Sequence, residues 1–367
     1  MAEKAIRLGG ESTADAIVSA VDSLYPEHTF EDKEFALKHN DDEIAVDTNF
    51  AAQSFWKDVR IRFFRKKSAV LGLVMIMIIL LLAIFGPGMN SYTYSGQDLS
   101  QKNFAPRVPG IEQFGILDGS EKMSTTTGSK SVNAYVEKGK DDVYYWFGSD
   151  TYGRDIWTRT WEGARVSLII AVAAAIIDMV IGMSYGLISG YFGGLFDEVL
   201  SGFMNSLWAL PTIVLAMAIN VALDASLFNI LLSVGIVNIP GFYRIVRSRV
   251  ISIKNMDYIM ATKAVGQNTL VIIFSHVLPN LLSTLIVEAT LCCSKAVIAE
   301  ASLSFLGLGV QLPHASWGTM LKAGYPLLNR APWICIIPGL FIVVLVLGLN
   351  LMGDGLRDAF DVRINAD

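Results

Sequence analysis

MDYIMATKAVGQNTLVIIFSHVLPN, residues 256–280, lies between two long apolar runs of the chain. Apolar residues recur in its first half at i, i+3, i+4 and i+8: Met256, Ile259, Met260 and Ala264. That spacing predicts a short helix, and a glycine such as Gly266 commonly ends one. A second helical run follows, with Pro279 near the start of the next apolar run, where proline is tolerated. We expect helix, turn and helix, serving either as a rigid lever for a soluble partner or as an interfacial helix on the lipid.

The composition around this stretch is that of a membrane protein. Of 367 residues, 53% are hydrophobic and 17% are charged, and the mean hydropathy is +0.46, above the usual range of soluble domains. Six windows are apolar enough to span a bilayer: 69–85, 166–191, 207–222, 227–243, 277–299 and 333–352. The first begins too far along the chain for a cleavable signal peptide. The sequence predicts an all-α polytopic membrane protein with six transmembrane helices.

Lysine and arginine predict the orientation of these spans. WKDVRIRFFRKK, residues 56–67, places six basic residues directly before the first span. The connection between the fourth and fifth spans carries five more: Arg244, Arg247, Arg249, Lys254 and Lys263. Basic segments stay in the cytoplasm, so we expect both termini and residues 249–276 to be cytoplasmic. The connection between the second and third spans, SGYFGGLFDEVLSG, has no basic residue and does not contribute to this prediction.

The segments outside the spans complete the expected organisation. Residues 1–55 contain twelve Asp or Glu against four Lys or Arg and predict an acidic cytoplasmic tail. Residues 56–88 hold the basic flank and the first span. Residues 89–146 are too long for an idle loop and predict a small extracellular subdomain, with strands at YTYSG and NAYVEKGKDDVYYW. Residues 147–363 hold the remaining five spans, and residues 364–367 end the chain.

The stretch YIMATKAVGQNTLVIIFSHVLPN, residues 258–280, resembles the EAA loop of ABC-importer permeases, a cytoplasmic coupling helix that docks in a cleft of the ATPase subunit. The resemblance implies an ATPase-coupling role for seven residues: Tyr258, Ala261, Thr262, Lys263, Gly266, His276 and Pro279. Thr262 and Gln267 depart from the pattern, because alanine is usual at both positions. Val271 and Ser275 replace residues that are often basic.

Three further blocks resemble the dipeptide, oligopeptide and nickel group of these permeases: residues 147–168, 300–321 and 350–363. Their motif residues are Gly148, Asp150, Gly153, Arg154, Asp155, Glu300, Trp317, Gly353 and Asp354. The resemblance covers about residues 56 to 363 and implies the type I ABC-importer permease fold. The chain is most like the second permease subunit of a Gram-positive oligopeptide importer. Gly202 and Asn205 depart from the group, which usually carries an arginine and an acid at these positions.

The resemblance also implies partners and a mechanism. The chain has no G-x-x-x-x-G-K-[ST] loop and no supported nucleophile–base pair, so we expect a transport subunit and not an enzyme. Two partner ATPase subunits would hold ATP and Mg, while this chain would bind no cofactor and no metal. A second, unlike permease and an extracellular substrate-binding protein would complete a complex in the bacterial cell membrane. That complex would import oligopeptides by alternating access, without a nucleic-acid partner.

Charged residues within spans are costly and by default indicate function. Asp178 in the second span, with Glu288 and Lys295 in the fifth, is expected to line the translocation path or to contact the partner permease. The alternative for Asp178 is a packing role with a protonated or hydrogen-bonded carboxyl. Glu288 and Lys295 are seven residues apart, too far for the usual intrahelical pair, so each is expected to pair with the partner chain. Glu300 is expected to be structural, and His276 to hold its loop by hydrogen bonds.

Three other functions stay open at this level. A channel or secondary transporter explains six spans but gives residues 256–280 no role. A scaffold or receptor would bind a ligand outside without transporting it. Within the resembling group, nickel or another small solute is an alternative cargo, although no His, Cys or Asp cluster in the sequence favours a metal. ATP-dependent uptake that requires partner chains would separate these readings.

Overall fold

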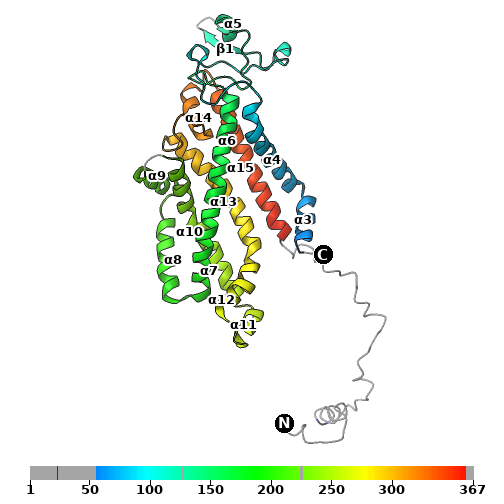
Figure 1. Ribbon diagram of the computed structural model, residues 1–367, viewed down its shortest axis with the longest axis vertical. Helices are drawn as coiled ribbons and strands as arrows, with labels where there is room; N and C mark the ends of the chain where they lie inside the picture. Colours follow the sequence, from blue (N-terminus) through cyan, green and yellow to red (C-terminus); the bar gives the residue numbers. More distant parts are fainter. Residues whose placement is uncertain (1–22, 24–54, 126–127, 224–225, 361–367) are drawn as a thin grey trace, which may run out of the picture. The chain divides into compact units, whose positions relative to one another are not determined.

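The computed structural model describes residue 23 and residues 55–125, 128–223 and 226–360. The chain divides into two units, Met1–Phe55 and Trp56–Asp367. The predicted acidic tail lies outside the described residues except at positions 23 and 55, and so does the predicted C-terminal end, residues 364–367. The second unit holds the helical bundle that Figure 1 shows.

The bundle is built almost entirely from helices. In chain order they are α3 (Phe55–Arg65), α4 (Lys67–Phe85), α6 (Ile156–Ile177), a π-helical turn η5 (Asp178–Gly182), α7 (Met183–Phe192), α8 (Gly194–Trp208), α9 (Thr212–Ala222), α10 (Leu227–Lys254), α11 (Asp257–Ala264), α12 (Thr269–Ile272), a second π-helical turn η6 (Ile273–Val277), α13 (Leu278–Leu306), α14 (Trp317–Gly324) and α15 (Trp333–Phe360). Five stretches are long and apolar enough to cross a membrane: α4, α6 with α7, α10, α12 with α13, and α15. The predicted all-α membrane fold is confirmed.

The third predicted span, residues 207–222, is a broken helix and not the single helix expected. Helices α8 and α9 meet at 92°, and the chain reaches six spans only if this bent pair counts as one. The break ends at Pro211, which has no amide hydrogen to donate to the carbonyl of Leu207 and disfavours helical backbone in the residue before it. By contrast α10 runs unbroken through Pro240 and extends to Lys254, eleven residues beyond the predicted end of the fourth span.

Small residues bring two pairs of helices into close contact. Gly182, Gly186 and Gly190 lie four residues apart along η5 and α7 and face α10. A Cβ atom added at Gly186 would lie 2.8 Å from the carbonyl oxygen of Tyr243. On the other side of the bundle, a Cβ at Gly72 of α4 would lie 2.6 Å from the carbonyl oxygen of Gly348 in α15. Such close backbone approach compensates, through van der Waals contact, for the lack of a hydrophobic drive between helices in lipid.

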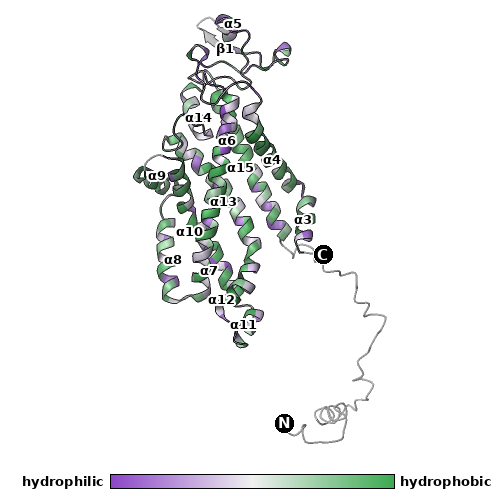
Figure 2. Cartoon of the chain, in the orientation of Figure 1, coloured by the Kyte–Doolittle hydropathy of each residue, from purple (hydrophilic) through white to green (hydrophobic). Residues whose placement is uncertain are grey.

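The region between α4 and α6 forms a small folded cap. Strands β1 (Ser120–Thr125) and β2 (Gly128–Asn133) pair antiparallel, next to a short helix α5 (Ala134–Glu137). Three aromatic residues make its core: Phe104, Tyr135 and Tyr145. In Figure 1, β1 and α5 lie at one end of the bundle and α11 and α12 at the other. Figure 2 shows hydrophobic residues predominating along the long helices between those ends.

The strands of this cap are not where the sequence predicted them. YTYSG, residues 92–96, is irregular, and residues 133–146 contain a helix, because the Asn133 side chain accepts a hydrogen bond from the Tyr135 amide and caps α5. The aromatic residues that suggested strands are used for packing. Tyr92 stacks on Tyr145 with ring centroids 4.7 Å apart, and Phe104 contacts Tyr135 at 4.4 Å. Aromatic enrichment indicated burial here and not strand pairing.

Candidate functional site

The first candidate site is the element of residues 256–280, hereafter the coupling element. Its helix α11 follows α10 directly and is held to the bundle by Ile259, which is fully buried. The other members of the predicted apolar stripe, Met256, Met260 and Ala264, are exposed. Val265 at the end of α11 is 88% exposed. The described residues therefore leave most of the surface of α11 uncovered, including apolar side chains.

The turn after α11 depends on Gly266. Its φ is +81°, in the left-handed region that favours glycine, and no atom lies within 4 Å of where a Cβ would be. The Gly266 amide donates to the carbonyl of Lys263, and the Gln267 amide donates to that of Thr262 at 3.2 Å. These bonds close the helix as its C-terminal carbonyls require. Glycine is needed for its backbone conformation and not for lack of space.

Hydrogen bonds join the two halves of the coupling element. His276 Nε2 lies 3.2 Å from Gln267 Oε1. The side-chain nitrogen Nδ2 of Asn280 donates to the backbone carbonyl of His276 at 2.6 Å and to the Tyr258 hydroxyl at 3.2 Å. The π-helical turn η6 contains His276 and ends two residues before Pro279. These bonds join α11 and the turn after it to the start of α13.

The coupling element is also fastened to α7. The Lys263 ammonium lies 5.1 Å from the centre of the Tyr191 ring, and that of Lys254 lies 5.7 Å from it. Both are cation–π distances. Nearby, Arg247 of α10 makes two hydrogen bonds of 2.6 Å to Asp197 of α8. The ends of α7, α8 and α10 are thus tied together next to α11.

The second candidate site is the group of charges within α6–η5 and α13. Lys295 Nζ lies 3.3 Å from Glu288 Oε1. The expectation that these two residues are too far apart to pair within α13 is wrong, because two turns of helix place them on one face and both side chains are long. A contact of either residue with the partner permease stays a prediction. Asp178 is fully buried, and neither carboxyl oxygen has a hydrogen-bond partner among the described residues. It sits at the start of η5, a π-helical turn of the kind often found at functional positions.

Glu300 and Trp317 hold the other end of the bundle together. Glu300 is fully buried and accepts hydrogen bonds from the hydroxyls of Ser167 at 3.0 Å and Ser304 at 2.7 Å. It thereby joins α13 to α6. The Trp317 indole donates to the carbonyl of Thr160 at 2.9 Å and joins α14 to α6. Both residues are placed for structural roles.

The motif before α6 forms the junction with the cap. Arg154 Nε lies 2.7 Å from Asp150 Oδ2, with both side chains buried. Asp155 caps α6 by accepting from the Thr158 amide at 2.8 Å, and it also accepts from the Asn90 side chain. Burial raises the pKa of Asp155 above its usual range, although its hydrogen bonds oppose this. Gly153, with φ +69°, lies against the carbonyl of Asp98, leaving no room for a side chain.

The predicted site residues therefore lie in separate groups along the bundle and do not form one pocket. The remaining motif residues are Gly148 at the cap junction, with φ +83°, and Gly353 and Asp354 in α15, buried and exposed respectively. Among the described residues, no group of three or more His, Cys, Asp or Glu side chains could hold a metal ion. Two features were missed from sequence: the Asp197–Arg247 pair, which no spacing rule reveals, and the glycines at 182, 186 and 190, whose G-x-x-x-G spacing was a readable signal.

Two protein-family profiles match the chain. One is described as binding-protein-dependent transport system inner membrane component and matches residues 182–366; the other, N-terminal TM domain of oligopeptide transport permease C, matches residues 54–106. The chain is 38% identical over 311 residues to the oligopeptide transport system permease protein of Bacillus subtilis (strain 168), covering 85% of this chain and 90% of that protein. It is 37% identical over 317 residues to the dipeptide transport system permease protein of Alkalihalophilus pseudofirmus, covering 86% and 93%.

Proposed function

The chain belongs to the family of binding-protein-dependent transport system inner membrane components, and on that premise we propose that it is a permease subunit of an ATP-driven oligopeptide importer. It is a multi-pass protein of the bacterial plasma membrane and a non-enzymatic transport subunit. The oligopeptide cargo is supported by relatives whose names specify oligopeptides and dipeptides.

The observation that carries this proposal is the exposed coupling element at the end of the bundle opposite the cap. Helix α11 has one fully buried anchor, Ile259, and leaves Met260 and Val265 uncovered. Neighbouring exposed apolar side chains on one helix are typical of a protein-interaction surface. We assign this surface to an ATPase subunit on the cytoplasmic side, with Tyr258, Ala261, Thr262 and Lys263 contributing to the contact.

The rest of the complex follows from this assignment. A second, unlike permease would face this chain across the translocation path, and two ATPase subunits would hold ATP and Mg. An extracellular binding protein would deliver the peptide at the cap end. This chain itself would bind no cofactor. Both termini would be cytoplasmic, which the basic residues of α3, of the C-terminal part of α10 and of α11 support through the positive-inside rule.

The contacts of the coupling element suggest how movement is transmitted. Tyr258 and His276 are both bonded to Asn280 at the start of α13, and Lys263 contacts Tyr191 of α7. A displacement of α11 by the ATPases would therefore move α13 and α7 together. Helices α10 and α15 contain Pro240 and Pro338, where bending is cheapest. We expect α10 and α15 to bend at these prolines when the translocation path opens alternately to the cytoplasm and to the outside.

Substituting Val265→Asp tests the proposal. A carboxylate on the most exposed apolar position of α11 would be buried against the ATPase, and we expect recovery of ATPase subunits with the tagged chain to fall at least about tenfold, the effect of about 1.4 kcal/mol. Val136→Asp on the cap, also exposed, is the matched control and should leave recovery unchanged. Equal ATPase recovery with both variants would contradict the assignment. A wild-type chain that purifies alone would favour a channel or scaffold.

A further inference from the structure

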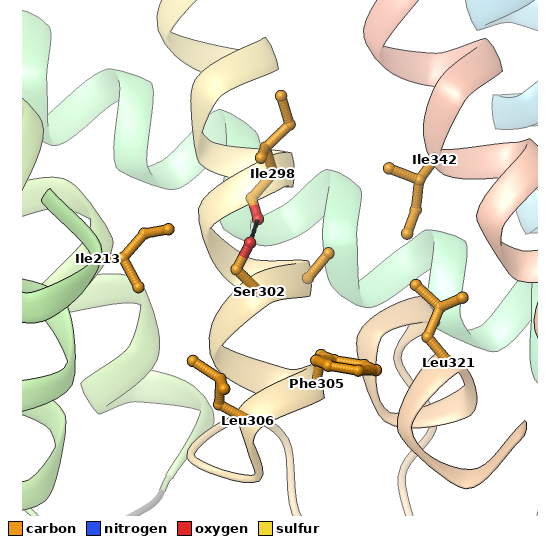
Figure 3. A pocket seen from close by; sticks show the side chains of 8 residues that line it. Ile213, Ile298, Ser302, Phe305, Leu306, Leu321 and Ile342 are labelled. Carbon is orange, nitrogen blue, oxygen red and sulfur yellow. Dashed lines mark hydrogen bonds between the residues drawn. The ribbon is translucent and has the colours of Figure 1, made fainter. Parts of the chain in front are cut away.

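An apolar groove of about 360 Å³ opens between four helices of the bundle. Its lining includes Ile213 of α9, Ile298, Ser302 and Phe305 of α13, Leu321 of α14 and Ile342 of α15. Figure 3 shows these side chains arranged around the hollow. The Ser302 hydroxyl is the one polar side-chain group among the lining residues, and it donates to the carbonyl of Ile298 at 2.7 Å. The groove therefore offers an occupant only apolar contacts.

A charge lies one helical turn from this groove, toward the α11 end. Lys295 precedes Ile298 by three residues and so projects from the same face of α13. Its side chain is 56% exposed. Lys295 lies about 16 Å from the end of α13 at Leu306, by the rise of a helix, or about half the thickness of a bilayer core. Even when paired with Glu288, an ammonium that is 56% exposed at that depth is costly against lipid, so we infer that this face of the bundle adjoins water or protein.

The break between α8 and α9 independently supports the inference that this face of the bundle adjoins water or protein and not lipid. Ala209, Leu210 and Pro211 are exposed and not helical, and a second hollow of about 330 Å³ lies over them. Non-helical backbone at membrane depth is tolerated only where it is buried in protein or lines a water-filled cavity. Ile213, two residues beyond the break, lines the apolar groove. The break, the groove and Lys295 therefore belong to one continuous face.

We propose that the groove and Lys295 form a subsite for the transported peptide, with the apolar C-terminal side chain in the groove and the C-terminal carboxylate on Lys295. This rests on the proposed oligopeptide cargo. The two groups branch from one Cα atom of the peptide, and the Cα atoms of Lys295 and Ile298 are about 4.5 Å apart along the helix axis. The Lys295 ammonium, which lies 3.3 Å from Glu288 Oε1, would turn toward the groove to meet the carboxylate. Glu288 positions the ammonium with one contact, and an ammonium has three donors. The two donors that Glu288 leaves free can bind a peptide carboxylate, whereas the acyl chain of a lipid has no anion to offer them.

Uptake by the complete transporter in proteoliposomes tests the subsite. The probes are two peptides of identical sequence ending in leucine, one with a free C-terminal carboxylate and one amidated, each at a concentration that saturates the binding protein. We expect the free acid to enter about tenfold faster, corresponding to one charge-assisted hydrogen bond. Lys295→Gln should remove this preference and Lys295→Arg should retain it. Lys102→Gln, at an exposed lysine of the cap far from the groove, should behave as wild type.

Further variants and one activity measurement separate loss of the subsite from loss of folding or assembly. Glu288→Gln combined with Lys295→Gln removes the pair without leaving a lone carboxylate and should also lose the preference. Ile298→Trp should slow peptides ending in leucine or phenylalanine and spare those ending in glycine, while Ile78→Trp, exposed on α4, should slow neither. Stimulation of ATP hydrolysis by the loaded binding protein reports on folding and assembly.

Each alternative has its own signature. A Lys295→Gln transporter that keeps both the preference and ATPase stimulation overturns the subsite. If the second permease no longer purifies with the Lys295→Gln chain, the subsite is overturned and Lys295 is instead a contact with that permease. A wild-type complex that hydrolyses ATP but imports neither peptide overturns the oligopeptide cargo itself, and the subsite with it.

Discussion

Asp155 shows how one side chain can join two parts of this protein. Its Oδ2 accepts from the Thr158 amide, which starts α6, and from the Asn90 side chain on the segment leading from α4 to the cap. Its Oδ1 is buried without a hydrogen-bond partner among the described residues. The Asp155 residue is only 1% exposed. Burial therefore disfavours the charged form of its carboxyl group and raises the pKa.

The raised pKa predicts a pH dependence of stability. The folded state holds the proton more tightly than the unfolded state, so the contribution of Asp155 is greatest below the unfolded pKa of about 3.9 and is lost as pH rises toward the folded value. Asp155→Asn stays neutral and retains an oxygen for the Thr158 amide. We expect the Tm of wild type minus that of Asp155→Asn to decrease between pH 4 and 8. Asp141→Asn, at an exposed aspartate of the cap, is the matched control. A constant Tm difference between wild type and Asp155→Asn would contradict the prediction.

At the scale of elements, the contact between α7 and α10 depends on glycine spacing. Gly182, Gly186 and Gly190 repeat every four residues and line the face of α7 that meets α10. Added Cβ atoms would lie within 2.8 to 3.0 Å of Phe242, Tyr243 and Arg247 atoms. Because α10 continues into the coupling element and α7 carries Tyr191, this helix pair forms part of the support on which α11 rests.

Gly186→Leu is therefore expected to be destabilising. Forcing α7 away from α10 should cost about 1–3 kcal/mol, the usual penalty of overpacking, and lower the Tm of the purified protein. Gly202→Leu in the adjacent helix α8 is the matched control, because no atom lies within 4 Å of its Cβ position. Similar Tm values for the two variants would show that α7 and α10 are not in close contact.

At the scale of the whole bundle, the cap and the coupling element lie at opposite ends (Figure 1). Phe114 on the cap is 80% exposed and Val265 on α11 is 88% exposed. If the cap is extracellular, Phe114→Cys should react with a membrane-impermeant maleimide in intact cells, and Val265→Cys only after permeabilisation. The native cysteines, Cys292, Cys293 and Cys335, would first be replaced by alanine. Labelling of both new cysteines only after permeabilisation, or the reverse pattern, would contradict the proposed orientation.

Local chemistry made much of this architecture predictable from sequence. Long apolar runs can satisfy their backbone only as helices in a membrane, so the spans could be predicted with little information about neighbours. The end of α11 was predictable because Gly266 is suited to a left-handed conformation that other residues avoid. The motifs before α6 and around residues 256–280 indicated the family, because each combines several residue types at fixed spacing.

What the sequence determined by itself is thus the membrane class, the helical fold, the coupling element and the family. Only the tertiary structure decided which aromatic residues of the cap pack instead of forming strands, how sharply α8 and α9 bend, that Glu288 pairs with Lys295, and that Lys295 borders an apolar groove. The physical reason is the distance along the chain over which each kind of interaction acts. Helix formation, capping and membrane partition depend on residues within a few turns, whereas burial, ion pairing and cavities depend on side chains that distant segments bring together.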